Sequence, residues 1–262
     1  MKIAVAGCLG RMGATLIEAV QADERFTLVA GSERADYDVT DVQTQLDAYG
    51  CGNLMVSSDV EEVANAADAV IDFTTPHATL AMAEAVAKKG GVHIIGTTGF
   101  TPEQIRQLEK FAKKSRMVRA GNFSPGVAVL SHLVRQAAAT LDTQYDIEIF
   151  EMHHKHKKDA PSGTALMLGE AAAQGRGGTL PDSIELDRNQ VREKGTIGFC
   201  VSRGGDVVGI HRAGFYGPGE MIELSHQGFS RHIYANGALK SALWAKDKKP
   251  GNYTIFDVLG LD

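Results

Sequence analysis

In the first part of the chain, short apolar runs alternate with longer stretches of helical periodicity. The apolar runs predict strands, because β-branched residues cluster in them, and the longer stretches predict helices. Thr101 and Pro102 suit the N-cap and the first position of one of these helices. The strands are expected at 2–6, 26–30, 69–73, 92–95 and 117–119, and the helices at 14–21, 80–89 and 102–114. This alternation predicts right-handed β–α–β units and a parallel sheet.

The pattern changes after Asn122. Helices are expected at 126–141, 164–173 and 234–245, and strands at 145–152, 195–202, 206–213 and 220–225, with a last strand or turn at 253–259. The later strands are joined by Gly204-Gly205 and Gly217-Pro218-Gly219, which predict a hairpin-rich sheet. The glycine-rich segment 174–181 is expected to be a flexible surface loop. We therefore predict an α/β fold with a second α+β domain built on a mixed sheet.

Composition narrows the class of protein. The 262-residue chain is 44% hydrophobic and 23% charged, which is typical of a globular protein, and its formal net charge of −5 argues against binding to nucleic acid or to a membrane. Three cysteines, Cys8, Cys51 and Cys200, are too widely spaced for a disulfide framework or a zinc ribbon, which favours a reducing compartment. The chain starts without a long apolar run, and none of its segments reaches membrane-spanning length. We expect a cytoplasmic protein.

A glycine-rich turn lies between the first predicted strand and the first predicted helix. Gly7, Gly10 and Gly13 are spaced G-x-x-G-x-x-G, which allows a tight turn and a close approach of the backbone to a pyrophosphate. Glu33 follows the second strand, where an acidic side chain can bind the hydroxyls of an adenosine ribose. The guanidinium of Arg34 can bind a ribose 2′-phosphate, so the pair is compatible with NADH, NADPH or both. The alternative is a surface Glu-Arg pair on an ordinary loop.

Three further loops follow predicted strands, at 73–76, 96–99 and 120–123. Open α/β sheets bind ligands at the carboxyl ends of their strands, so we expect these loops to line the nicotinamide end of a dinucleotide. A structural role in turn formation is the alternative for each of them.

The segment 151–165 is the richest in chemical groups, with three histidines, three lysines and a predicted helix start. Imidazoles suit proton transfer near neutral pH, and the lysines and the helix-start amides around Ser162 suit an anionic substrate. A metal site is disfavoured, because adjacent side chains of an extended strand point in opposite directions and the ammonium groups repel a cation. A solvated charged face is the third interpretation of Lys155, Lys157 and Lys158.

Together these motifs resemble the 4-hydroxy-tetrahydrodipicolinate reductase family, also called dihydrodipicolinate reductases, over essentially the whole chain. The matching motifs are 7–13, 33–34, 96–99, 122–124, 151–165 and 236–238 before 241–244. The resemblance implies a Rossmann-type doubly wound parallel sheet formed by 1–123 and 236–262. It implies a domain of 124–235 that binds substrate and forms a homotetramer. The implied reaction is NADH- or NADPH-dependent reduction of 4-hydroxy-tetrahydrodipicolinate, a cyclic dicarboxylate, in lysine and diaminopimelate biosynthesis, without a metal.

The resemblance also assigns roles to individual residues. His153 is the expected catalytic proton donor, with Lys157 as a second catalytic group. Substrate contacts are expected from His154, Gly163 and Thr164, to which the helix-start argument adds Ser162. Cofactor contacts are expected from Gly7, Cys8, Leu9, Gly10, Arg11, Met12, Glu33, Arg34, Gly96, Thr97, Thr98, Ala120, Gly121, Asn122 and Phe123.

The chain departs from the family pattern at Gly121, at Lys158 and in the segment 187–194, which is shorter than the family's loop before Gly195. Two other classes of protein stay open. Another two-domain nicotinamide dehydrogenase would account for residues 7–33 but not for the histidine- and lysine-rich segment. A non-enzymatic redox sensor would need only the nucleotide-binding half.

Overall fold

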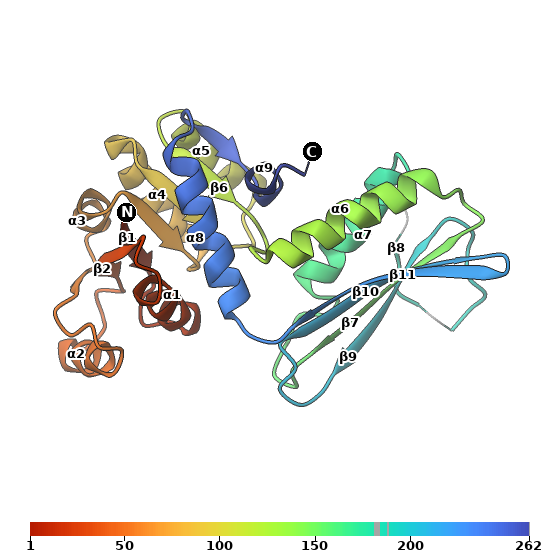
Figure 1. Ribbon diagram of the computed structural model, residues 1–262, viewed down its shortest axis with the longest axis horizontal. Coiled ribbons are helices and arrows are strands. Elements are labelled where there is room, and N and C mark those ends of the chain that lie inside the picture. The colour runs from red at the N-terminus through yellow and green to blue at the C-terminus, as the bar shows by residue number, and fades with distance from the viewer. Residues whose placement is uncertain (181–183, 188, 262) are drawn as a thin grey trace. The chain divides into compact units, whose positions relative to one another are not determined.

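The computed structural model describes residues 1–180, 184–187 and 189–261. The chain forms two compact units, one of Met1–Phe123 with Arg231–Asp262 and one of Ser124–Ser230 (Figure 1). The return to the first unit at Arg231 precedes the predicted residue 236, because the helix that starts at His232 belongs entirely to the first unit. Each unit has its own sheet.

A parallel seven-stranded sheet in the order β12-β6-β5-β4-β1-β2-β3 organises the first unit. Its strands are β1 (Lys2–Ala6), β2 (Thr27–Ser32), β3 (Met55–Ser57), β4 (Ala69–Asp72), β5 (Val92–Ile95), β6 (Arg116–Arg119) and β12 (Gly251–Tyr253). Strand order reverses direction at β1 and β4, so a ligand-binding crevice is expected at their carboxyl ends. This sheet, with the second unit described below, confirms the predicted fold class.

Helices cover both faces of this sheet. They are α1 (Arg11–Gln21), α2 (Val39–Ala48), α3 (Val60–Ala66), α4 (Pro76–Lys89), α5 (Pro102–Ala112), α8 (His232–Lys246) and α9 (Ile255–Leu259). On one face, buried residues of α3 and α4 pack against alternate residues of β1 and β4, which include Ala4, Ala6 and Val70. On the other face, α8 lies against α1 (Figure 1). Gly237 lets α8 approach the loop after β6, because a Cβ there would lie 1.7 Å from the carbonyl oxygen of Phe123.

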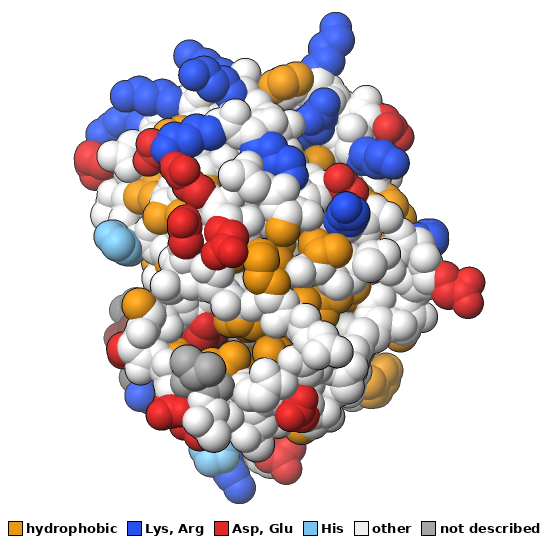
Figure 2. Space-filling model, turned by 90° about the vertical axis from the view of Figure 1, so that its left-hand side faces the viewer, with side chains coloured by type: hydrophobic (Ala, Val, Ile, Leu, Met, Phe, Trp, Pro, Cys, Tyr) orange, Lys and Arg blue, Asp and Glu red, His pale blue; other side chains and the backbone are white. Residues whose placement is uncertain are grey.

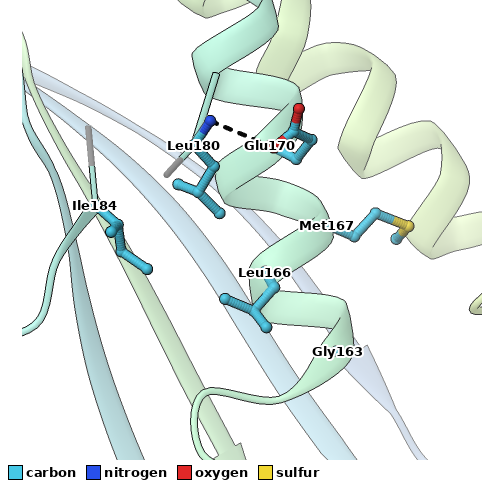
Figure 3. Close-up of a pocket in the computed structure, with 6 residues that line it drawn as sticks. All are labelled: Gly163, Leu166, Met167, Glu170, Leu180 and Ile184. Atoms are coloured by element: carbon cyan, nitrogen blue, oxygen red, sulfur yellow. Dashed lines mark hydrogen bonds between the residues drawn. The ribbon is translucent and has the colours of Figure 1, made fainter. Parts of the chain in front are cut away.

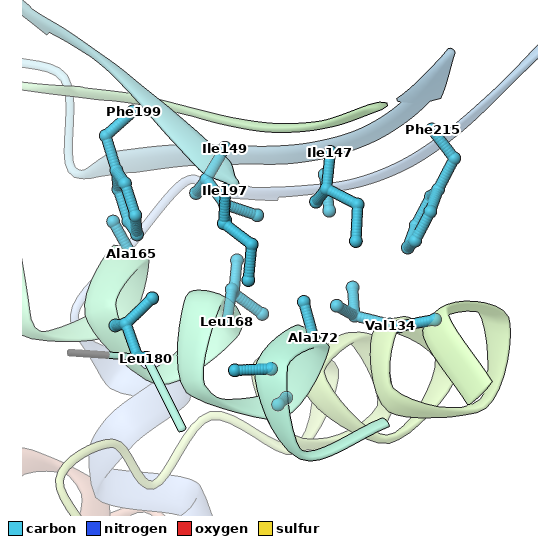
Figure 4. Packing of buried hydrophobic residues seen from close by; sticks show 14 of the residues in the cluster. Val134, Ile147, Ile149, Ala165, Leu168, Ala172, Leu180, Ile197, Phe199 and Phe215 are labelled. Atoms are coloured by element: carbon cyan, nitrogen blue, oxygen red, sulfur yellow. The ribbon is translucent and has the colours of Figure 1, made fainter. Parts of the chain in front are cut away.

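The second unit is a mixed five-stranded sheet with two helices on one face. Its order is β11-β10-β7-β9-β8. The elements are α6 (Pro125–Thr140), β7 (Asp146–His153), α7 (Gly163–Gly175), β8 (Ile184–Glu185), β9 (Ile197–Arg203), β10 (Gly209–Gly217) and β11 (Glu220–Gly228). Every second residue of β7 is buried from Ile147 onward, and Ile147, Ile149 and Phe215 pack against Val134 of α6 and Leu168 of α7 (Figure 4). The period of two predicted from the sequence is therefore present.

Two local predictions were wrong. Gly204-Gly205 does not close a hairpin, because β7 lies between β9 and β10 and pairs with both. The segment 253–259 is mainly the helix α9, which Thr254 and Asp257 start with a capping box. By contrast, the hairpin at Gly217-Pro218-Gly219 is present between β10 and β11. Within the predicted loop 174–181, α7 continues to Gly175, and residue 181 lies outside the described residues.

Figure 2 shows lysine and arginine side chains gathered toward the top of one face, with carboxylate side chains below them. Both signs of charge are thus present on this face, in keeping with a formal net charge of −5. Across the described part of the chain, none of the helices is both long and apolar enough to cross a bilayer.

Candidate active site

The turn after β1 is built on glycine. Gly7 has a φ of 65°, and a Cβ on Gly13 would lie 2.3 Å from the carbonyl oxygen of Gly7. A side chain at Gly13 would therefore push α1 away from the turn. Gly10 is the N-cap of α1 and, as a glycine, has no side chain to cap it, so the first amides of the helix are left for a ligand or solvent. This is the geometry that binds a pyrophosphate.

A cavity of about 750 Å³ opens beside this turn. Of the predicted cofactor contacts, Gly7, Gly10, Glu33 and Arg34 line it. The Glu33 carboxylate accepts hydrogen bonds from the backbone N–H groups of Leu9, at 3.3 Å, and of Arg34, at 3.1 Å. Sequence reasoning missed Ser32, Tyr37, Ser58 and His77, which also line the cavity. The Arg34 guanidinium lies 5.3 Å from the centre of the Tyr37 ring, so this ring holds the side chain expected to read a 2′-phosphate.

Cys8 can contribute only its backbone to this site. Its side chain is fully buried, and burial raises the pKa of the thiol to about 12, with a further increase from Glu33. The thiol is therefore protonated and unreactive at neutral pH.

The three loops predicted to line the nicotinamide end do meet. The Phe73 ring fills the space that a side chain on Gly96 would need, with ring carbons 2.2–2.5 Å from an ideal Cβ, and it lies 5.8 Å from the Phe123 ring. Thr98 and Gly121 also approach each other, since the Thr98 methyl group is 3.9 Å from where a Gly121 Cβ would be. Gly96, Thr98, Gly121 and Phe123 thus lie in one cluster at the carboxyl edge of the sheet.

In the second unit, His153 ends β7 and is oriented by a buried carboxylate. Its Nδ1 lies 2.5 Å from Oε2 of Glu151, two residues earlier on the same face of the strand. Glu151 has no exposed surface and accepts two hydrogen bonds of 2.9 Å from Arg203 and one of 3.0 Å from the Ser162 N–H. Burial raises the pKa of Glu151, but these hydrogen bonds outweigh burial and hold its pKa below the ordinary value. Because an ionised carboxylate only accepts, Nδ1 of His153 carries a proton and Nε2 is left for chemistry.

A second buried histidine lies beside His153. His211 of β10 is in register with Glu151, and its ring centre is 5.0 Å from that of His153 in an edge-to-face arrangement. Burial lowers the pKa of His211 to about 3, and burial also lowers the pKa of His153, although the bond to Glu151 acts in the opposite direction. Gly209 leaves room at the other ring nitrogen, because a Cβ there would lie 3.1 Å from Nε2 of His153. Sequence reasoning gave no role to Arg203, His211 or Gly209.

The solvated-face interpretation of the three lysines fits Lys155 and Lys158, which are exposed, but not Lys157. Lys158 is exposed, whereas Lys157 is more buried and its Nζ lies 2.9 Å from Oδ1 of Asp159. Burial raises the pKa of Asp159, but the Lys157 hydrogen bond and the backbone N–H of Gly163 together lower it. The Asp159 carboxylate is therefore held between the ammonium group of Lys157 and the first residue of α7.

Ser162 has an internal role. Its hydroxyl accepts from the Ala165 N–H at 3.2 Å and so caps α7, while its own N–H donates to Glu151. A substrate contact through this amide would require the Glu151 bond to break. His154 is half-buried, with its ring centre 6.2 Å from that of His156.

An apolar groove of about 450 Å³ begins at Gly163 and runs along α7 (Figure 3). Leu166, Met167, Leu180 and Ile184 supply most of its lining, and Glu170 is engaged by the Leu180 N–H at 3.4 Å. These side chains offer little to a dicarboxylate. In the described part of the chain, no group of three or more His, Cys, Asp or Glu side chains is placed to hold a metal ion.

Comparisons with known proteins identify the family of this chain. The family model of the dihydrodipicolinate reductase N-terminus matches residues 1–123, and that of the C-terminus matches residues 126–259. The 4-hydroxy-tetrahydrodipicolinate reductase of Dinoroseobacter shibae is 49% identical over 99% of this chain and 98% of its own length. The enzyme of the same name from Bartonella quintana is 46% identical over 100% and 98%.

Among solved structures, a dipicolinate-bound dihydrodipicolinate reductase from Paenisporosarcina sp. TG-14 superposes with a TM-score of 0.78 at 25% identity, covering 98% of both chains. GenD2 of gentamicin A biosynthesis, solved with NAD, shares only the fold, with a TM-score of 0.60 at 15% identity over 100% of this chain and 90% of its own. The chain belongs to the 4-hydroxy-tetrahydrodipicolinate (dihydrodipicolinate) reductase family, whose members are NAD(P)H-dependent oxidoreductases of lysine biosynthesis.

Proposed function

We propose that this chain reduces 4-hydroxy-tetrahydrodipicolinate with NADH or NADPH and that His153 supplies the proton. The observation that carries the proposal is the 2.5 Å contact between His153 and the buried Glu151, because it orients Nε2 and stabilises the charged imidazolium. The reaction is inferred from family membership, and the identity of the proton donor is inferred from this contact.

The first unit fits the cofactor. Gly7 and Gly13 leave no room for a side chain at the turn, and Glu33 and Arg34 line the adjoining cavity. When bound, NADH or NADPH supplies the hydride. The protein's part there is to hold the adenosine ribose with Glu33, a 2′-phosphate with Arg34, and the far end with the loops that meet at Phe73.

The second unit handles the substrate's charge and the proton. Conversion of this hydroxylated cyclic imine to tetrahydrodipicolinate releases the hydroxyl group as water and takes up one hydride and one proton. Hydride addition leaves a ring carbon that must be protonated, and Nε2 of His153 is the oriented donor. Lys157 and the amide of Gly163, which now hold the Asp159 carboxylate, would hold a substrate carboxylate in its place. His154 and Thr164 complete the proposed substrate contacts, and a contact from the Ser162 amide would have to replace its bond to Glu151.

The test compares two ring acids on wild-type protein. Pyridine-2,6-dicarboxylate should inhibit competitively with substrate, and pyridine-2-carboxylate should inhibit about one to two decades more weakly, because each charge-assisted hydrogen bond contributes ~1.5–3 kcal/mol. Lys157→Ala should remove much of that difference, whereas the exposed Lys158→Ala is the matched control and should keep it. Equal inhibition by the two acids on wild-type protein would contradict the substrate assignment.

We further propose a homotetramer formed through the second unit. Helices α6 and α7 pack on only one face of the five-stranded sheet, and the other face carries half-buried and exposed side chains that include Phe150, Met152 and Tyr216. On that face, the Arg212 guanidinium lies 5.6 Å from the centre of the Phe150 ring. Sedimentation velocity should give a tetramer for the wild type and smaller species for Phe150→Glu; a wild-type monomer at micromolar concentration would refute the assembly.

A cytoplasmic location also stays part of this proposal. Its support is the biosynthetic role of the family and the three cysteines, Cys8, Cys51 and Cys200, which are all free thiols. Cysteine labelling of the protein in intact and lysed cells would test it.

A further inference from the structure

A buried polar cluster lies beneath the loops that follow β4 and β5 in the first unit. It consists of Asp72, Thr74, Thr79, His93 and Thr97. Asp72, Thr79 and His93 have no exposed surface, and Thr97 is 5% exposed. Such burial of a carboxylate and an imidazole is costly unless their hydrogen bonds are satisfied, so the cluster needs a reason to be there.

Asp72 is the hub of this cluster. One carboxylate oxygen lies 3.3 Å from Nε2 of His93 on the neighbouring strand. The other accepts from the Thr74 hydroxyl at 2.6 Å, from the Thr74 N–H at 3.0 Å and from the Thr97 hydroxyl at 3.3 Å. Burial raises the pKa of Asp72, but these hydrogen bonds, that of His93 foremost, outweigh burial and lower it, so the group is a carboxylate that only accepts.

The direction of every other bond follows from that charge. Since the Thr97 hydroxyl donates to Asp72, its oxygen is free to accept from the Thr79 hydroxyl at 2.8 Å and from the Thr74 N–H at 3.0 Å. These bonds therefore have defined directions, apart from the 3.4 Å contact between the Thr74 and Thr79 hydroxyls, in which either can donate. The cluster fixes Thr74 of the loop after β4 to Thr97 of the loop after β5.

Both loops belong to the proposed cofactor site. Thr74 lines the cavity, and its methyl group lies 2.8 Å from where a Cβ on Gly7 of the pyrophosphate turn would be. The neighbouring Phe73 packs on Gly96 and Phe123. A shift of the Asp72 carboxylate would therefore move the surfaces that face both ends of a dinucleotide.

We propose that Asp72 and His93 are positioning residues for cofactor binding, which lock the loops after β4 and β5 in the shape that receives NADH or NADPH. The inference rests on the proposed function. A hydrophobic pair would fill the space between β4 and β5 at least as favourably, since burying polar groups costs free energy that their hydrogen bonds only offset. What apolar side chains cannot provide is the fixed orientation of Thr74 and Thr97.

The experiment measures the dissociation constants of NADH and NADPH by the fluorescence of the reduced nicotinamide, without substrate, together with KM for the imine. His93→Leu should weaken both cofactors by about tenfold to a hundredfold, the equivalent of one charge-assisted hydrogen bond, and leave the substrate KM within about twofold. His93→Gln, which offers an amide N–H in place of Nε2–H, should restore most of the affinity. Asp72→Ala should match or exceed the effect of His93→Leu if it folds, and the two His93 variants decide the matter if it does not.

The control is Val70→Ala. Val70 is buried in the same strand and pairs with His93 in the sheet register, but it takes no part in the polar cluster. It should lower the melting temperature without changing cofactor affinity. The inference is overturned if His93→Leu changes cofactor affinity no more than Val70→Ala does, or if His93→Gln is as weak as His93→Leu. A wild-type chain that binds neither cofactor would instead overturn the proposed function itself.

Discussion

Glu151→Gln is the substitution that most directly tests how His153 is made into an acid. The change preserves the shape of a side chain with no exposed surface but replaces one acceptor oxygen by an NH₂ donor. The carboxylate now accepts from His153, from Ser162 and twice from Arg203. A glutamine can accept through only one oxygen, so one of the two Arg203 bonds is lost together with the bond of either His153 or Ser162, and the negative charge beside His153 is lost in both cases.

The magnitude follows from the bond to His153. A charge-assisted hydrogen bond contributes ~1.5–3 kcal/mol, and it acts on the imidazolium, which is the form that donates the proton. Its loss should lower kcat/KM for the imine by about one to two decades at neutral pH. Because Glu151 raises the pKa of His153 against the larger effect of burial, the falling limb of the pH–rate profile should move to lower pH in the variant.

The assay follows oxidation of NADH or NADPH over a range of pH, with cofactor affinity measured separately. Glu148→Gln is the matched control, since Glu148 lies on the same strand, also pairs with an arginine, Arg192, and lies on the opposite face from His153. The control should change kcat/KM less than about twofold and leave the pH profile in place. A Glu151→Gln enzyme with the activity and pH profile of the control would show that this carboxylate does not support the proton donor.

Three further outcomes are expected. Arg34→Ala should weaken NADPH by about 10- to 100-fold and NADH little, because only NADPH carries the 2′-phosphate; titrations with an unchanged NADPH to NADH ratio would refute that contact. Gly209→Ala should reduce turnover by up to about 100-fold by crowding Nε2 of His153, while Gly204→Ala, which meets only the flexible end of a methionine, should not. The pKa of His211 is about 3 in the folded chain, against an ordinary value of 6.5, so protons bind preferentially to the unfolded chain. The free energy of unfolding should therefore fall as the pH drops from 6.5 toward 3, by at most about 1.4 kcal/mol per pH unit. Urea denaturation at several pH values in that window should show a weaker dependence of the free energy of unfolding on pH for His211→Leu than for the wild type.

In the first unit, the strands that could be predicted from the sequence are the apolar ones that are buried on both faces of the sheet. The runs at β1, β4 and β5 are almost entirely buried, so each appears as a continuous apolar segment followed by a glycine or threonine loop. The elements α2, β3 and α3 were not predicted, because this edge of the sheet is short and polar. The N-caps Asp38 and Asp59, each of which accepts from two backbone N–H groups, were the available signals.

Strand order in the second unit could not be obtained from turns alone. Gly204-Gly205 has the composition of a tight turn, but a turn sequence specifies only local conformation. The strand beside β9 depends instead on the crossover through α7, which brings the chain back to the sheet. Because that crossover is followed by β8 and β9, β7 receives β9 as a parallel partner and β10 as an antiparallel one. The same non-local pairing brings Arg203 beside Glu151.

Half of the proposed catalytic arrangement was nevertheless contained in one short segment. Glu151 and His153 are two residues apart, and a strand places such residues on the same face, so their contact could have been predicted from the alternation alone. Arg203 and His211 come from other strands, with no local signal that they meet here. The pair Asp72 and His93 was equally hidden, because each residue stands within an apolar strand and its partner is identified only by the register of β4 and β5.

In the proposed mechanism, the electrostatics of the second unit would couple proton donation by His153 to the binding of substrate. Burial lowers the pKa of His153, so the ring resists protonation while no further negative charge is nearby. The Asp159 carboxylate is paired with Lys157, so it adds little to the field at His153. A bound dicarboxylate would bring negative charge toward the same lysine, and negative charge favours the imidazolium. His153 would then carry its positive charge chiefly when substrate is bound. An exposed histidine with an unperturbed pKa would not respond to substrate in this way.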